Sequence, residues 1–95
     1  MEEGRKNVRI SLPNEVKGGV YANNMVVAHT REEFVLDFLM VIPPEGTVNA
    51  RVIVSPGHVK RIFEALRDNI SKYEKNFGTI KMAEDPKVLG FVQTK

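Results

Sequence analysis

The first half of this chain alternates apolar and polar residues, as strands that are half-buried in a sheet do. Val8, Ile10 and Leu12 alternate with polar neighbours, which predicts a first strand. Residues 20–30 also have the composition of a strand, although two asparagines interrupt it with a bulge or a bend. These two segments favour an antiparallel sheet that begins early in the chain.

The clearest strand covers residues 34–42, where both faces are apolar except at Asp37. Residues 43–46, with two prolines and a glycine, predict a turn. Residues 48–55 then form the antiparallel return strand. The sequence therefore predicts a β-meander of three to four strands.

The period changes to that of a helix after Ser55, which suits the N-cap position, and Pro56 suits the first helical turn. Gly78 closes the pattern. The apolar residues are spaced 4, 3, 4, 3 and 4 apart and form a narrow stripe. Its members are Val59, Phe63, Leu66, Ile70, Tyr73 and Phe77. One long amphipathic helix is predicted, and its stripe must be buried against a sheet or a second chain.

These elements define an α+β fold, a meander followed by one long helix, in a single domain over residues 7–82. Residues 1–6 are expected to be a disordered tail, and residues 83–95 a C-terminal extension that either docks on its own subunit or adds a strand to the sheet edge of a neighbour. A strand that is apolar on both faces needs two covers, and one helix supplies one. We therefore expect a homodimer or a higher oligomer.

Asp37 is the sharpest polar anomaly, because a carboxylate in the middle of an apolar strand needs a partner. A hairpin that turns near residue 44 brings Arg51 opposite Asp37 or diagonal to it, and an ion pair would satisfy both. A catalytic role would need a second titratable group in the same cleft, and the sequence nominates none. The pair is interpreted as structural.

Composition adds few constraints: 42% of the residues are hydrophobic and 27% are charged, as in an ordinary globular protein. There is no cysteine, so neither a disulfide framework nor a cysteine-based zinc site is expected. His29 and His58 lack the spacing of a metal site, and no cofactor signature is present. Without a signal peptide or a long apolar run, the chain is predicted to be cytoplasmic and not bound to a membrane.

Two candidate sites for negatively charged ligands remain. The helix start could hold an anion on its free N–H groups; the residues concerned are Ser55, Gly57, His58, Lys60 and Arg61. A nucleic-acid surface would instead combine Arg5, Lys6, Arg9, Lys60 and Arg61. The net charge of +2 and the acidic residues nearby favour a solvated surface of mixed charge.

Four segments together resemble an uncharacterised family of short bacterial and archaeal proteins, catalogued as a domain of unknown function. They are GVYAN at 19–23, EFVLDF at 33–38, RVIVSPGHVKR at 51–61 and YEKNFG at 73–78. The resemblance implies a complete small protein with variable ends, and it brings no activity, cofactor or catalytic residue.

The predicted function is that of a non-enzymatic, homo-oligomeric protein-interaction module, such as an adaptor or a chaperone-like protein. Its partners would be a second copy of itself and another protein. The alternative is a nucleic-acid-binding regulator that uses the basic residues above. An enzyme ranks third, because no set of nucleophile, base and orienting group is present.

Overall fold

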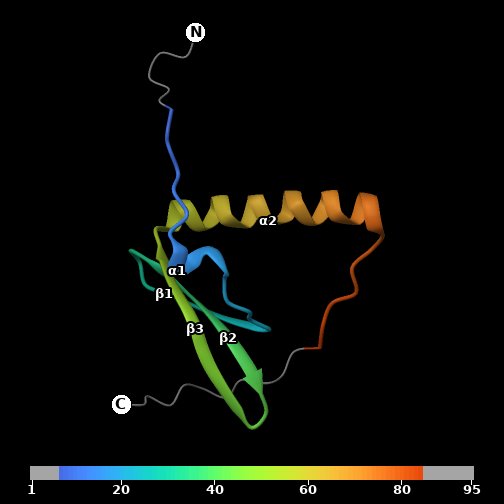
Figure 1. Cartoon of the computed structure of the whole chain (residues 1–95), viewed down its shortest axis with the longest axis horizontal. Helices are drawn as coiled ribbons and strands as arrows, with labels where there is room; N and C mark the ends of the chain where they lie inside the picture. Colours follow the sequence, from blue (N-terminus) through green and yellow to red (C-terminus); the bar gives the residue numbers. More distant parts are fainter. Residues whose placement is uncertain (1–6, 85–95) are drawn as a thin grey trace.

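The computed structural model describes residues 7–84 and has an α+β architecture in which a three-stranded antiparallel sheet precedes one long helix (Figure 1). The elements are α1 (Asn14–Lys17), β1 (Asn24–His29), β2 (Phe34–Ile42), β3 (Glu45–Val54) and α2 (Pro56–Phe77). The strands lie in the order β1-β2-β3, so β2 is central, and its two neighbours are the strands that precede and follow it in sequence. The predicted fold class is confirmed, with three strands.

The hairpin of β2 and β3 forms the centre of the sheet. The strands turn at Pro43 and Pro44, and Ile42 pairs with Glu45 directly after the turn. A bulge on β3 places Asn49 between two pairs, so that Phe38 lies opposite Ala50. Beyond the bulge the register is regular as far as the end of β3.

Just before the edge strand β1, a side-chain amide continues the hydrogen bonding to β2. The Asn23 backbone N–H donates to the Leu39 carbonyl at 2.9 Å. The Asn23 carboxamide then bonds the backbone of Val41 in both directions, since Nδ2 donates to the carbonyl at 3.0 Å and Oδ1 accepts from the N–H at 2.9 Å. The amide thus stands in for a peptide group and extends the ladder along β2.

Helix α2 has the predicted boundaries. The Ser55 hydroxyl accepts the His58 N–H at 3.2 Å, as an N-cap does, and Pro56 occupies the first turn. At the other end Gly78 takes a φ of 94°, a left-handed value that favours glycine, and its N–H reaches the Glu74 carbonyl. The first turns of α2 lie near the sheet, and its second half extends beyond it (Figure 1).

Two N-terminal features differ from the prediction. Residues 8–12 form no strand, because in the described part of the chain no strand edge lies beside them; Ile10 is 91% exposed. The short helix α1, which follows Pro13, was not predicted. Strand β3 also begins three residues before the predicted return strand.

The predicted ends of the chain lie largely outside the described residues. The predicted tail at 1–6 and residues 85–95 of the predicted C-terminal extension are not among the described residues. Residues 83 and 84 have no regular secondary structure. The docked C-terminal strand therefore stays a prediction.

The buried core is small and lies on β2. Within residues 7–84 only Leu36, Asp37 and Leu39 are buried. They lie on both faces of the strand, since Leu36 points to one side and the other two to the opposite side. The chain therefore covers the centre of its sheet and leaves most other apolar side chains accessible.

Candidate interaction surface

The apolar stripe of α2 comprises the six residues predicted from the spacing. Most of its side chains are not covered by the described part of the chain. Val59 in the first turns is half-buried. The other five members are between 48% and 74% exposed. Tyr73 and Phe77 contact each other, with ring centroids 5.0 Å apart. An exposed stripe of this length is unusual for a monomer.

The stripe carries a preformed depression near its centre. Phe63, Leu66, Arg67 and Ile70 line this apolar depression. The Arg67 guanidinium lies 6.0 Å from the centre of the Phe63 ring and borders the depression. Four residues at these positions form the hole that receives a side chain in knobs-into-holes packing.

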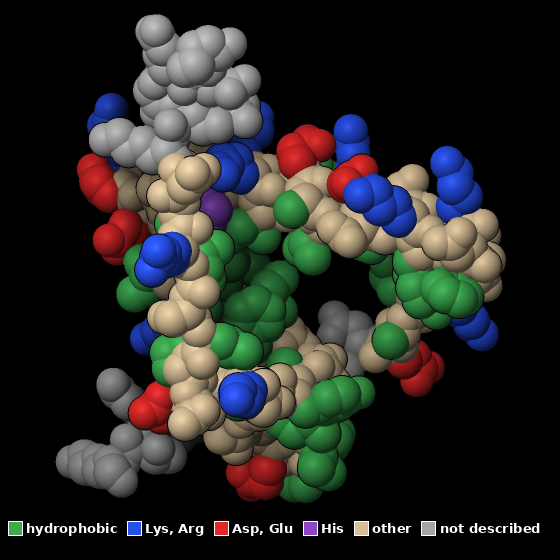
Figure 2. Space-filling view, turned by 45° about the horizontal axis from the view of Figure 1, so that its top comes forward, with side chains coloured by type: hydrophobic (Ala, Val, Ile, Leu, Met, Phe, Trp, Pro, Cys, Tyr) green, Lys and Arg blue, Asp and Glu red, His purple; other side chains and the backbone are tan. Residues whose placement is uncertain are grey.

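A second apolar surface lies on the sheet. Alternation places Met25 of β1 and Val52 of β3 on the same face as Leu36, and Val27 lies beside them. These three flanking residues are between 44% and 47% exposed. Figure 2 shows hydrophobic side chains along the inner side of α2 and on the sheet opposite, on either side of an opening. The two apolar surfaces therefore face a common space.

The Asp37–Arg51 pair forms as predicted, across paired positions of β2 and β3. The Arg51 Nε donates to Asp37 Oδ1 at 2.7 Å, and Nη2 donates to Oδ2 at 2.9 Å. The hydrogen bonds from Arg51 lower the pKa of the Asp37 carboxyl, and its charge adds to this effect against the opposing effect of burial. Both carboxylate oxygens are engaged by Arg51, which supports a structural role.

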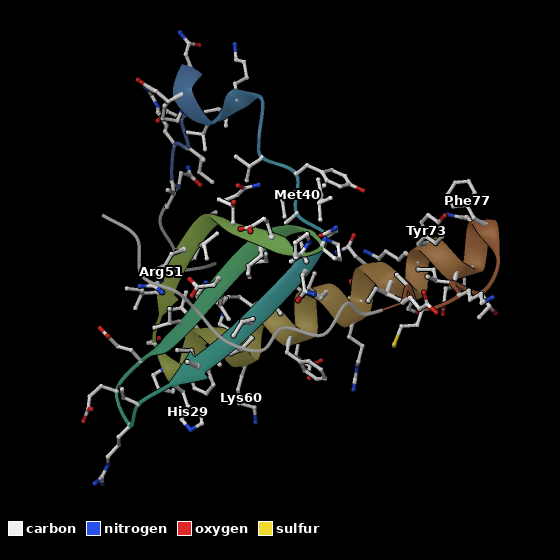
Figure 3. All side chains as sticks on the ribbon, turned by 90° about the horizontal axis from the view of Figure 1, so that it is seen from below. His29, Met40, Arg51, Lys60, Tyr73 and Phe77 are labelled. Carbon is white, nitrogen blue, oxygen red and sulfur yellow. The ribbon has the colours of Figure 1, made fainter. Side chains whose placement is uncertain are left out.

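The five residues of the candidate anion site all lie in the first turns of α2, and all are exposed. The Ser55 hydroxyl already occupies the His58 N–H, and the Ser55 carbonyl accepts from Val59 at 3.0 Å. Lys60 extends outward from the helix (Figure 3). The geometry is that of an ordinary capped helix start.

The predicted nucleic-acid surface lies only partly within the described residues. Arg5 and Lys6 lie outside the described residues, and Arg9 belongs to the segment before α1. Along α2, basic and acidic side chains alternate (Figure 2). Two contacts on the helix surface join such pairs: Arg67 to Glu64 at 3.7 Å and Lys72 to Asp68 at 3.2 Å.

The histidines have packing and backbone roles. The His29 ring stacks on Phe34 with centroids 5.2 Å apart, across the paired ends of β1 and β2. Among residues 7–84 no group of histidine and carboxylate side chains could hold a metal ion. In the same range no helix is long and apolar enough to cross a membrane.

Sequence reasoning did not identify the exposed sheet face formed by Met25, Val27 and Val52. The alternation along each strand contained a signal for it, because the three residues share a face with Leu36 once the strands are in register. The pairing of Val52 with Leu36 follows from the bulge at Asn49, which the sequence did not indicate.

Taken together, the fold and the site define a small α+β protein. Its three-stranded sheet is formed within one chain, and its helix presents an uncovered apolar stripe. The chain belongs to the family described as "Protein of unknown function (DUF3467)", whose model matches residues 1–82. The expected membership of an uncharacterised family is thereby confirmed. No curated protein and no solved structure matches the chain.

Proposed function

We propose that the protein is a non-enzymatic, homo-oligomeric interaction module, of the adaptor or chaperone-like kind, that binds another protein through apolar surface. The exposed α2 stripe is the observation that carries this proposal. A stripe with five members about half or more exposed is costly to leave in water, at about 25 cal/mol for each Å² of apolar surface.

The opposed apolar surfaces add to this support, because one surface can hold a second copy while the other receives a partner. Both lie within one chain, along α2 and on the face that carries Val27 and Val52. The lack of cysteine in the sequence is compatible with action in a reducing compartment, and we place the protein in a prokaryotic cytoplasm.

Light scattering and a pull-down from native lysate test this function with two neighbouring variants. Leu66→Glu places a charge in the stripe, whereas Ala65→Glu adds the same charge on the opposite side of α2. The wild type and the Ala65→Glu variant should be oligomeric and should retain the same defined proteins at high salt. The Leu66→Glu variant should be a monomer.

A wild-type chain that is monomeric at micromolar concentration would contradict the oligomeric part of the proposal. Material lost on nuclease treatment or at high salt would instead support the nucleic-acid alternative. If Leu66→Glu and Ala65→Glu change the retention of partner proteins by the same amount, the binding surface lies elsewhere than on the stripe.

A further inference from the structure

The spacing of the α2 stripe reads the same in both directions along the helix. Its six residues are separated by 4, 3, 4, 3 and 4 positions, so they are symmetric about position 68. A second α2 laid antiparallel about a two-fold axis beside Asp68 would place every stripe residue opposite another one. The layers would be Leu66 with Ile70, Phe63 with Tyr73, and Val59 with Phe77.

We propose that α2 pairs with α2 of a second copy in this antiparallel register, as a two-stranded coiled coil with closed two-fold symmetry. The inference rests on the proposed function, because it specifies how the oligomer forms. Closed symmetry requires the same surface on both copies, and a palindromic stripe supplies it.

The depression on the stripe fits this register. It is lined by Phe63, Leu66, Arg67 and Ile70, and its centre lies between positions 66 and 67. In the antiparallel register the residue of the second copy that faces this centre is Ile70. A β-branched side chain of that size is a suitable knob for a four-residue hole.

Charged residues beside the two ends of the stripe would also face residues of opposite charge in the second copy. Lys60, Arg67 and Glu74 follow the stripe residues Val59, Leu66 and Tyr73 and lie along one flank. Antiparallel pairing brings Lys60 of each copy opposite Glu74 of the other, which gives two pairs of opposite charge. Glu74 also accepts the Ile80 N–H at 2.9 Å, which holds its side chain at the helix surface. Arg67 meets its own copy at the axis, and its contact with the Phe63 ring directs it along the helix.

Two neighbouring charge reversals test the register without changing the stripe. Lys60→Glu should raise the dissociation constant of the dimer on the order of tenfold, because both cross-pairs become repulsive. The added exchange Glu74→Lys should restore affinity. Arg61→Glu makes the same charge change on the outer face and should have little effect. Equal effects of Lys60→Glu and Arg61→Glu would overturn the register.

Spin-label distances test the orientation directly on the full chain. The sequence has no cysteine, so Arg61→Cys, Asp68→Cys and Lys75→Cys each introduce one labelling site. The three positions are seven residues apart and lie on the outer face of α2. With a rise of about 1.5 Å per residue, antiparallel pairing offsets the two labels along the axis by about 21 Å at positions 61 and 75 and by almost nothing at 68.

The expected result is therefore a short distance at position 68 and two similar, longer distances at 61 and 75. One common distance at all three positions would show parallel pairing and overturn the proposal. A dimeric mass with any other distance pattern would overturn the α2 pairing and leave self-association standing. A monomeric mass would overturn both the pairing and the oligomeric function.

Discussion

The β2–β3 hairpin and helix α2 differ in how completely the rest of the chain pairs or covers their side chains. In the hairpin, Asp37 is only 3% exposed, yet both its carboxylate oxygens are bonded by Arg51 on the facing strand. On α2, the salt bridges described above join residues of the same helix, and the stripe faces open space. The hairpin therefore carries most of the internal stability of the fold, whereas α2 leaves most of its apolar stripe accessible.

The largest expected loss comes from the centre of the sheet. Leu39→Ala should lower the free energy of unfolding by about 2–5 kcal/mol, because it leaves a cavity beside the buried Asp37 carboxylate. Urea denaturation at a fixed protein concentration measures this loss. Ile42→Ala on the same strand removes an exposed side chain and should cost much less. Similar losses for both variants would show that the core does not lie where β2 is buried.

A truncation on α2 should act through association instead. Leu66→Ala should raise the dissociation constant of the oligomer on the order of a hundredfold, because each copy loses buried apolar surface at the interface. Sedimentation equilibrium measures it, and Val20→Ala, at an exposed site away from α2, is the control. A stability loss for Leu66→Ala that is independent of protein concentration would mean that α2 is covered by its own chain.

Acid should affect the hairpin through Asp37. Arg51 lowers the pKa of this carboxyl in the folded chain, so its stabilising contribution is fully present above the unfolded value of about 3.9 and is lost as the pH falls through the folded value. Acid unfolding followed by circular dichroism should show a steeper loss of stability below about pH 4 in the wild type than in Asp37→Asn. Identical slopes would mean that the pair does not form in solution.

The smallest expected effect is at the start of α2. Ser55→Ala should cost about 1 kcal/mol, because the His58 N–H loses its acceptor. Ser55→Gly should cost only a few tenths of that amount, since glycine is tolerated at the cap. Thermal unfolding of both variants measures the difference. Equal losses would mean that the hydroxyl does not cap the helix.

The sequence was sufficient where a pattern is satisfied within a short stretch of chain. Residues 34–42 and Ser55 to Gly78 have their predicted boundaries because alternation, helical spacing and caps are local properties. The Asp37–Arg51 pair was also predicted, since a turn near Pro44 brings Arg51 opposite Asp37 or diagonal to it, and the bulge at Asn49 makes the two residues directly opposite.

The prediction failed where structure depends on a partner at a distance. Val8, Ile10 and Leu12 alternate as a strand does, but alternation cannot show whether a segment reaches a sheet edge, and these residues lie outside the three-stranded sheet. For the same reason the exposure of Met25 and Val27 could not be predicted, because it depends on what α2 leaves uncovered.

The off-centre position of α2 over its sheet has a consequence for the assembled protein. If two copies of α2 pair in antiparallel orientation about their midpoints, the two sheets lie at opposite ends of a rod. The length of this rod is set by the 22 residues of α2. Each dimer would then present two identical binding faces separated by about 30 Å. Such a bivalent particle would hold a repetitive or paired target far more tightly than either face alone, through effective concentration and without any further contact.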